Sequence, residues 1–184
     1  MNKNDIKILK EIIDDIGILS SLTNYDCSKF LYSLKHLTSQ LVYFYRDVAK
    51  NSESDNVYYK VRNYPQEHDL IYVNLGRGFP KELMDGHWCY VVKNYGYKLL
   101  VIPTTSIKED SSFNEEFEFD IISRFNNYIK MSRLSITDMR CIDMQRIDER
   151  KKRAEVLTDR KEILRFINDK VRYWNKIKKM LSWR

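Results

Sequence analysis

The 184-residue chain has few of the residues that build cross-linked, metal-bound or membrane-spanning proteins. Its three cysteines, Cys27, Cys89 and Cys141, are odd in number and far apart, which predicts buried thiols in a reducing cytoplasm. Its three histidines show no zinc-ligand spacing with them, so we expect no metal and no other cofactor. No apolar run approaches the roughly 20 residues that span a membrane, and the first fifteen residues lack the apolar segment of a signal peptide. We therefore expect a cytoplasmic protein that makes no membrane contact.

Two common catalytic motifs are also missing. No glycine-rich loop ends in Lys-Ser or Lys-Thr, which argues against nucleotide hydrolysis of the P-loop kind. No serine is framed by the glycines of a nucleophile elbow. With only five glycines and three prolines but thirteen tyrosines, the composition is that of a globular protein. The length suits one domain, or one domain with an extension.

The net charge of +6 is unevenly distributed along the chain. Residues 1–60 carry eight basic and eight acidic side chains, residues 61–123 carry six and ten, and residues 124–184 carry eighteen and eight. The basic final third predicts either a face that attracts phosphates or an ordinary solvated helix surface.

Two amphipathic helices are predicted at the N-terminus, over residues 4–20 and 26–50. The second has large apolar side chains at alternating four- and three-residue spacing, at Phe30, Leu34, Leu37, Leu41, Phe44 and Val48. Such a stripe must be covered by the first helix, by the rest of the chain or by a second copy, so core packing and a dimer seam both remain open. Polar residues 51–55 predict a linker, which divides the chain into a helical extension at 1–55 and a domain at 56–184.

The remainder reads as short strands followed by one helix. The central segment, residues 69–106, predicts strand, loop, strand, turn and strand. Further strands are predicted at 57–64, 117–121, 128–131 and, with a kink, 139–147. The charged segment 148–157 is open between turn, helix and strand, and a helix follows from Thr158 to about Ser182, with an apolar stripe that includes Ile163, Phe166 and Ile167. The expected fold class is α+β, a small SH3-like antiparallel β-barrel with a C-terminal helix and a two-helix N-terminal extension.

A polar loop and a hydroxyl-rich strand end belong to neighbouring strands of the central segment. The loop over residues 76–86 contains glycines, a proline and four charged side chains, and His87 follows it directly. Thr104, Thr105 and Ser106 end the third strand. If these groups meet at one rim of the barrel, they suit RNA cleavage by the RNA's own 2′-hydroxyl, which needs a general base and groups that stabilise the phosphorane charge. Imidazole titrates near neutrality and fits the acid or base role.

This order of motifs resembles the MazF/PemK family of toxin ribonucleases. That family has a Gly-Asp-hydrophobic strand, a glycine-rich loop with Glu, a basic residue leading into strand two, and a strand ending in Thr-Ser or Thr-Thr. The matching residues are Asp69 to Leu75, Glu82, His87 and Thr105-Ser106. A second block, Ile136 to Ile147, is similar to the family strand leu-ser-gln-ile-arg-thr-ile-asp-lys-x-arg-leu. The resemblance covers about residues 67–184. It departs from the family at His87-Trp88, where Arg-Pro is usual, and at Pro80-Lys81-Glu82, where Gly-Ser-Glu is usual.

The resemblance implies a sequence-selective, metal-independent endoribonuclease toxin of a type II toxin-antitoxin system. It implies single-stranded RNA as substrate, a cognate antitoxin protein and a homodimer. His87 takes the place of the catalytic arginine, Thr105 that of the catalytic hydroxyl, and Glu82 that of the loop glutamate. The residues we expect to bind substrate, by charge, hydrogen bonding or base stacking, are Arg77, Lys81, Ser106, Phe79 and Trp88.

Each of these residues also has a structural interpretation. His87 fits a strand cap, Glu82 fits an ion pair with Arg77 or Lys81, and Trp88 fits the core. Two non-catalytic functions compete accordingly. The same family fold carries gyrase-poisoning toxins, which bind a protein and cleave nothing, and the basic C-terminal part suits an RNA-binding regulator.

Overall fold

The computed structural model describes residues 1–48, 61, 64–79 and 81–181. The chain divides into two compact units, Met1–Glu53 and Ser54–Arg184, which we call the helical unit and the barrel unit. The predicted linker at 51–55 lies outside the described residues, as does most of the strand predicted at 57–64. Val61 and Tyr64, the described members of that segment, are not in a strand.

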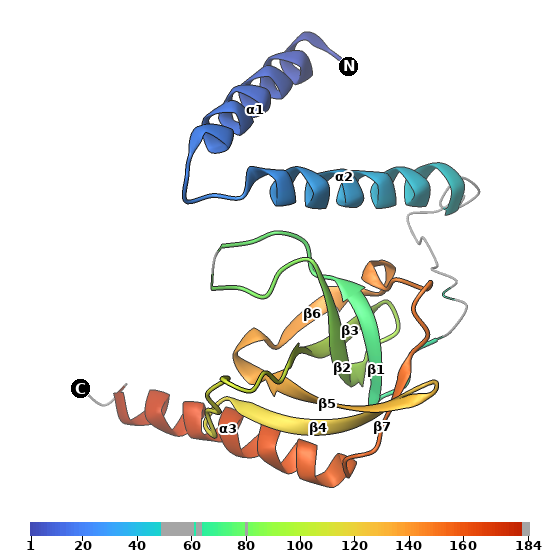
Figure 1. Ribbon diagram of the computed structural model, residues 1–184, viewed down its shortest axis with the longest axis vertical. Coiled ribbons are helices and arrows are strands. Elements are labelled where there is room, and N and C mark those ends of the chain that lie inside the picture. Colours follow the sequence, from blue (N-terminus) through green and yellow to red (C-terminus); the bar gives the residue numbers. More distant parts are fainter. Residues whose placement is uncertain (49–60, 62–63, 80, 182–184) are drawn as a thin grey trace. The chain divides into compact units, whose positions relative to one another are not determined.

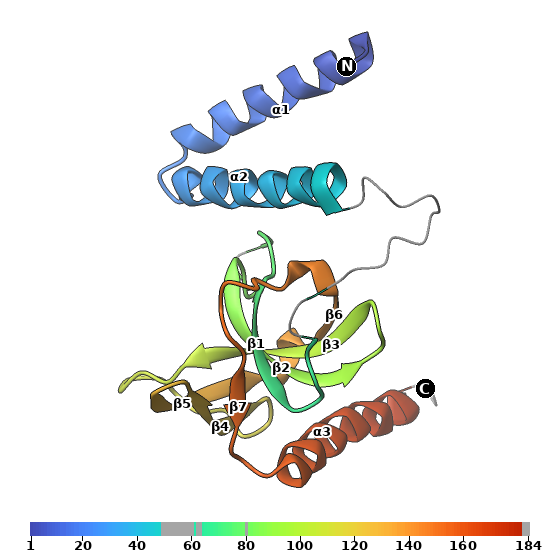
Figure 2. The same ribbon diagram turned by 90° about the vertical axis from the view of Figure 1, so that its right-hand side faces the viewer.

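The helical unit consists of α1 (Lys3–Ser21) and α2 (Cys27–Tyr43), and α2 continues into one wider turn at Phe44–Val48. Both helices have side-chain caps. Asn2 and Asp5 cap α1 reciprocally, because each side chain accepts a hydrogen bond from the other residue's backbone N–H. Asp26 caps α2 by accepting from the backbone N–H of Lys29. The two helix axes diverge from the turn that joins them (Figures 1 and 2).

The barrel unit contains seven strands and one helix among its described residues: β1 (Asp69–Asn74), β2 (Gly86–Asn94), β3 (Lys98–Ser106), β4 (Glu118–Phe125), β5 (Tyr128–Ser135), β6 (Arg140–Asp143), β7 (Ala154–Val156) and α3 (Arg160–Leu181). The pairing order β2-β1-β7-β4-β5-β3 closes on itself, because β2 also pairs with β3. The result is a six-stranded antiparallel barrel, with β6 added at the edge of β3. The α+β prediction, with its C-terminal and N-terminal helices, is confirmed.

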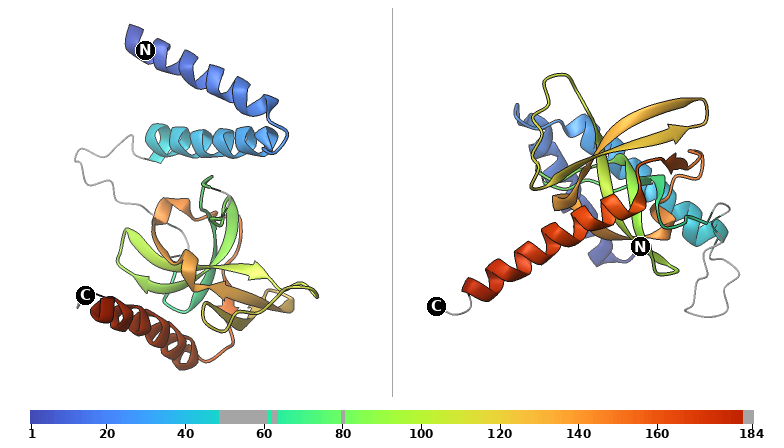
Figure 3. Two further views of the ribbon diagram at one scale, coloured as in Figure 1. Left: turned by 90° about the vertical axis from the view of Figure 1, so that its left-hand side faces the viewer. Right: turned by 90° about the horizontal axis from the view of Figure 1, so that it is seen from below.

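Strands β1, β2 and β3 have apolar side chains on both faces, and two separate clusters bury these faces. One cluster fills the barrel interior and extends to Ile163 and Ile167 of α3, which lies along the barrel (Figure 3). The second cluster packs β6 and Met144 against the other face of β1, β2 and β3. In β1, Leu70 belongs to the first cluster while Ile71 and Val73 belong to the second, which follows from the two-residue period of a strand.

Strand β3 holds the barrel together because it pairs with three neighbours. One of its edges pairs with β2, and the other pairs first with β6, at Lys98–Val101, and then with β5, at Thr104–Ser106. The β2–β3 pairing ends at Cys89 and Pro103. Beyond that pair the two strands separate, and this split lies beside the loop between β1 and β2.

Several sequence predictions need correction. Cys27 and Cys89 are buried as expected, but Cys141, also predicted to be a buried thiol, is exposed. The strands predicted at 117–121 and 128–131 are longer, as β4 and β5 show. The strand predicted over 139–147 stops at Asp143, whose carboxylate accepts the Gln145 N–H at 2.8 Å and starts a 3-10 turn at Met144–Arg146. The undecided segment 148–157 contains β7, which pairs with both β1 and β4.

Candidate functional site

The loop between β1 and β2 projects from one end of the barrel (Figure 1) and is closed at its neck by two backbone hydrogen bonds. Leu75 N–H donates to Asp85 O, and Asp85 N–H donates to Gly76 O, both at 2.7 Å. Asp85 and Gly76 have φ values of 63° and 82°, the left-handed region that lets the chain turn sharply at the neck. The neck therefore holds two charged residues, Arg77 and Asp85, close to the start of β2.

Arg77 lies at this neck and is largely buried, with 18% of its side chain exposed. Its Nε is 3.4 Å from Asp85 Oδ2, and its Nη1 is 3.8 Å from the sulfur of Met84. Its Nε and Nη2 atoms are buried without a hydrogen-bond partner in the described part of the chain. The Asp85 carboxylate already faces this guanidinium, and its Oδ1 is likewise buried without a hydrogen-bond partner among the described residues, so the two charges are paired but poorly aligned.

His87 opens β2, where its backbone pairs with Val73 of β1. Its ring atom Nδ1 is 3.2 Å from the carbonyl oxygen of Thr104. A carbonyl oxygen can only accept a hydrogen bond, so Nδ1 must carry the proton. The neutral ring is therefore the tautomer whose Nε2 has a free lone pair, which is the form that a general base requires.

Side chains replace the missing backbone bonds where β2 and β3 separate. The Thr104 hydroxyl donates to the carbonyl of Trp88 at 3.0 Å, and the His87 ring donates to the carbonyl of Thr104. Thr104 is thus buried and committed to the strand. Thr105, whose backbone pairs with Arg133 of β5, is only partly buried. Cys89 pairs with Pro103, and His87 and Thr105 each lie two residues from that pair along their own strands. Side chains two residues apart point to the same face, so Thr105 and His87 share a face of the sheet.

Asp138 and Arg140 form a contact that sequence reasoning missed. The backbone N–H of Leu83 donates to Asp138 Oδ1 at 3.2 Å, which fastens the tip of the loop to the segment between β5 and β6. Asp138 also accepts from Ser135 Oγ at 2.8 Å and pairs with Arg140 at 3.3 Å. Arg140 pairs through its backbone with Val101 of β3, which in turn pairs with β2. Burial raises the pKa of the Cys89 thiol in β2, and the charge of Arg140 opposes that rise. Both residues lie in the second motif block, Ile136 to Ile147. The resemblance of that block to the family strand was the feature of the sequence that could have identified them.

The other loop residues have different surroundings. Glu82 accepts the backbone N–H of Phe79 at 2.9 Å, so its carboxylate caps its own loop. A Cβ at Gly78 would overlap that carboxylate. The ion pair considered between Glu82 and Arg77 is replaced by the pair between Arg77 and Asp85. Lys81 is exposed, and Phe79 is 82% exposed.

Ser106, at the end of β3, accepts a hydrogen bond from Lys130 Nζ at 3.0 Å. Lys130 lies on β5, close to the hairpin that joins β4 and β5. A second cation is therefore fixed at the same strand end as Thr105.

Trp88 lies on the strand face opposite His87 and is part of a row of four aromatic rings. It packs edge-on against Tyr72 at 5.4 Å and against Phe125 at 4.8 Å, and Phe125 stacks on Tyr128 at 5.2 Å. Lys151 lies 5.9 Å above the Tyr72 ring. Phe125 is buried and Tyr128 is exposed, so the row runs from the core to the surface.

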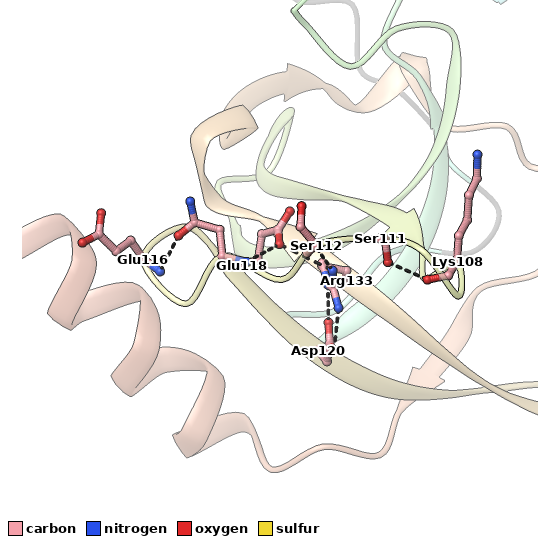
Figure 4. Close-up of polar contacts among 8 residues, drawn as sticks. Lys108, Ser111, Ser112, Glu116, Glu118, Asp120 and Arg133 are labelled. Carbon is pink, nitrogen blue, oxygen red and sulfur yellow. Dashed lines mark hydrogen bonds and ion pairs between the residues drawn. The ribbon is translucent and has the colours of Figure 1, made fainter.

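Arg133 anchors the acidic segment between β3 and β4 to the barrel (Figure 4). Its guanidinium pairs twice with Asp120, at 2.8 and 3.2 Å, and donates to the carbonyl of Ser112 at 2.8 Å. It also lies 4.7 Å above the Phe113 ring. The hydrogen bond to Asp120 raises the pKa of Arg133 and keeps it charged. These contacts join β5 to β4 and to the segment between β3 and β4. Because the Arg133 backbone pairs with Thr105, they also fix β5 beside Thr105.

Comparison of the chain with protein-family models and with curated proteins finds no match. Within the described residues, no three histidine, cysteine or carboxylate side chains are grouped so that they could hold a metal ion. The same residues contain no helix both long and apolar enough to cross a membrane.

Proposed function

We propose that this chain is a metal-independent endoribonuclease of the MazF/PemK toxin type, which cleaves single-stranded RNA through the RNA's own 2′-hydroxyl. The observation that carries the proposal is the His87 ring, whose Nδ1 is held by Thr104 and whose Nε2 keeps a lone pair. A histidine whose Nδ1 is held and whose Nε2 can accept a proton is suited to act as the general base in a 2′-hydroxyl attack.

In the proposed reaction His87 Nε2 removes the 2′-hydroxyl proton. The 2′-oxygen then attacks the adjacent phosphorus, and the bond to the 5′-oxygen breaks, leaving a 2′,3′-cyclic phosphate. The departing 5′-oxygen takes a proton from water. Arg77 and Arg140, whose carboxylate partners in the structure are Asp85 and Asp138, stabilise the charge that builds on the phosphate oxygens, and Thr105 adds a hydroxyl donor.

The aromatic row supports a single-stranded substrate. Tyr128, exposed at one end of the row, offers a ring on which a base can stack, and Lys151, over Tyr72 at the other end, offers a cation for a phosphate. Lys81, Phe79 and Ser106 add charge, ring and hydroxyl at the same end of the barrel. A homodimer and a restraining antitoxin belong to the proposal through the family resemblance, and a cytoplasmic location through the cysteine pattern of the sequence.

The test is to incubate the purified chain with single-stranded RNA in EDTA and to analyse the fragment ends. We expect cleavage that persists in EDTA and leaves cyclic or 2′/3′-phosphate ends with free 5′-hydroxyls. Intact RNA, or cleavage that EDTA abolishes, would contradict the proposal.

The second candidate is an RNA-binding module without catalysis. The observation that favours it is Glu82, the counterpart of the family's loop glutamate, whose carboxylate is used to cap its own loop. This candidate predicts salt-dependent retention of RNA with no fragments.

A further inference from the structure

The Asp138 carboxylate joins three segments of the barrel unit. Its Oδ1 accepts hydrogen bonds from the backbone N–H of Leu83, in the loop between β1 and β2, at 3.2 Å, and from Nη2 of Arg140, at the start of β6, at 3.3 Å. Its Oδ2 accepts a hydrogen bond from the hydroxyl of Ser135, the last residue of β5, at 2.8 Å. The Asp138 side chain is 14% exposed, so these three donors satisfy a carboxylate that has little contact with water.

Arg140 is held by one edge of its guanidinium group. Its Nε donates to the Asp138 backbone carbonyl at 3.2 Å and its Nη2 donates to the Asp138 carboxylate, so both bonds use the same side of the planar group. Its Nη1 makes no hydrogen bond with a described residue, and the side chain is 32% exposed. Asp138 therefore fixes the direction of this guanidinium and leaves the other edge open to a phosphate oxygen.

Arg140 and His87 lie on the same face of the sheet. Arg140 pairs with Val101 of β3, and Val101 pairs with Val91 of β2. Residues directly opposite each other in antiparallel strands have their side chains on one face, and so do residues two apart along a strand. His87 is four residues from Val91 along β2, so its side chain shares that face with Arg140. The residue that Asp138 orients is thus on the face of the proposed general base.

The same carboxylate also holds the loop between β1 and β2. Backbone hydrogen bonds close the neck of this loop, and the bond from Leu83 N–H to Asp138 fixes its far part to the barrel. Phe79 and Lys81, both exposed, lie in the span between these two attachments. One side chain therefore connects the loop residues expected to bind RNA with the segment that carries Arg140.

We propose that Asp138 is a positioning residue for RNA cleavage, which directs Arg140 toward the scissile phosphate and holds the loop against the RNA. This inference rests on the proposed function, because it concerns how Arg140 meets the phosphate. The negative charge of Asp138 strengthens the bond to Arg140, whereas the Leu83 N–H needs only an acceptor oxygen. Asp138→Asn separates the two roles, because it removes the charge and keeps an acceptor.

The first test measures kcat and KM on a fluorescent single-stranded RNA. Asp138→Asn should lower kcat roughly tenfold and change KM less than about threefold, because Arg140 acts on charge that builds only in the transition state. Asp138→Ala should lower kcat at least as far and also raise KM, because it releases the loop as well. The matched control is Asp110→Asn, at an exposed aspartate between β3 and β4, which should keep both constants.

A double-mutant cycle tests whether Asp138 acts through Arg140. In a chain that already carries Arg140→Ala, Asp138→Asn should lower kcat less than about twofold, because the group that Asp138 orients is gone. An aspartate with a purely structural role would cause the same loss in both backgrounds, and that result would overturn the proposal. A wild-type kcat in the single variant Asp138→Asn would overturn it too.

The hold on the loop is measured without RNA, by digestion with endoproteinase Lys-C and mass spectrometry of the fragments. Asp138→Ala should raise the rate of cutting after Lys81 roughly tenfold, because the loop loses a charge-assisted hydrogen bond, and Asp138→Asn should cut at nearly the wild-type rate. Wild-type protection of Lys81 in Asp138→Ala would contradict the hold on the loop.

The outcomes separate this inference from the proposed function. A wild-type chain that leaves RNA intact would overturn the proposed function, and this inference with it. A wild-type chain that cleaves RNA while Asp138→Asn and Asp138→Ala cleave it equally well would overturn only the role of Asp138.

Discussion

The barrel unit and the helical unit satisfy their apolar residues in different ways. The barrel unit buries eighteen hydrophobic side chains in two clusters, and both faces of its central strands are covered from within. The helical unit buries two hydrophobic side chains among its described residues, Cys27 and Phe44, and its first helix buries none. The barrel unit therefore contains its own stabilising core, whereas most apolar side chains of the helical unit are exposed within that unit.

The same contrast extends to polar residues. In the barrel unit, side chains bond backbone atoms far away in sequence: Asp138 accepts from the backbone N–H of Leu83, and Arg133 donates to the backbone carbonyl of Ser112. In the helical unit, the ion pairs join residues within one turn of each other, such as Lys7 with Glu11. Long-range contacts fix the positions of barrel side chains relative to one another, whereas the ion pairs of the helical unit depend on local helix geometry alone.

The largest expected effect comes from a matched pair of histidine substitutions. His87→Ala should lower RNA cleavage by roughly two to four orders of magnitude, the usual contribution of a general base. His36→Ala, in α2, should leave the rate unchanged. The measurement is the initial rate on a fluorescent single-stranded RNA. Equal rates for the two variants would remove His87 from the reaction.

A matched pair of leucine substitutions tests the two kinds of burial. Leu134, in the barrel core, has no exposed surface, whereas Leu9 is 46% exposed. Leu134→Ala should reduce the free energy of unfolding by about 2–5 kcal/mol, because it leaves a cavity. Leu9→Ala should reduce it by less than about 1 kcal/mol at concentrations where the chain is monomeric. Urea titration measures both, and similar losses would contradict the comparison.

The ion pairs provide a smaller contrast. Asp120→Asn removes the partner of the buried Arg133 and should lower the melting temperature clearly. It should also make the segment between β3 and β4 more sensitive to limited proteolysis, since Arg133 ties that segment through Ser112. Asp47→Asn removes the exposed partner of Arg46 and should not shift the melting temperature measurably. If Asp47→Asn proved as costly as Asp120→Asn, the contrast between the units would fail.

The smallest effect is a pH dependence within the barrel. Burial lowers the pKa of His68, and the charge of Arg160 lowers it further, while Asp69 and Asp159 act in the opposite direction. The His68 ring lies 3.0 Å from the hydroxyl of Tyr90, whose pKa burial raises to about 12. As the pH falls through the unfolded pKa near 6.5, the unfolded chain takes up a proton that folded His68 resists, so stability falls.

The corresponding measurement compares unfolding midpoints of the wild type and His68→Gln between pH 7.5 and 5.5. The wild type should lose more stability on acidification than the variant does. Parallel profiles would show that His68 does not contribute.

The fold could be predicted because its signals are local. The apolar run at residues 70–73 fits a strand with apolar side chains on both faces, and the stripe through Ile163 and Ile167 indicated a helix that packs on a core. The apolar pattern of the sequence did not predict the structure at two places, where other contacts decide the conformation. Met144 to Ile147 was predicted to continue the strand, but the Asp143 carboxylate accepts the Gln145 N–H and a 3-10 turn forms there. The three residues of β7 are too short to show a period, and only their pairing with β1 and β4 defines them as a strand.

The candidate site was predicted in outline only. The position of His87 at a strand start beside a polar loop followed from the order of the motifs. Its contact did not, because Thr104 rather than Thr105 receives the His87 ring, and that choice depends on where β2 and β3 separate. Asp138 was missed because its loop partner, Leu83, is 55 positions away and contributes only a backbone N–H.

The hydrogen bond from His87 Nδ1 to the Thr104 carbonyl has a consequence for proton transfer. The imidazolium ion also carries a hydrogen on Nδ1, so this bond is present in both charge states and becomes stronger when the ring is positive. The ring can gain and lose a proton at Nε2 without rotating and without disturbing the backbone of β3. Little reorganisation energy then opposes the proton's movement, and the same histidine can return to its starting state after each transfer.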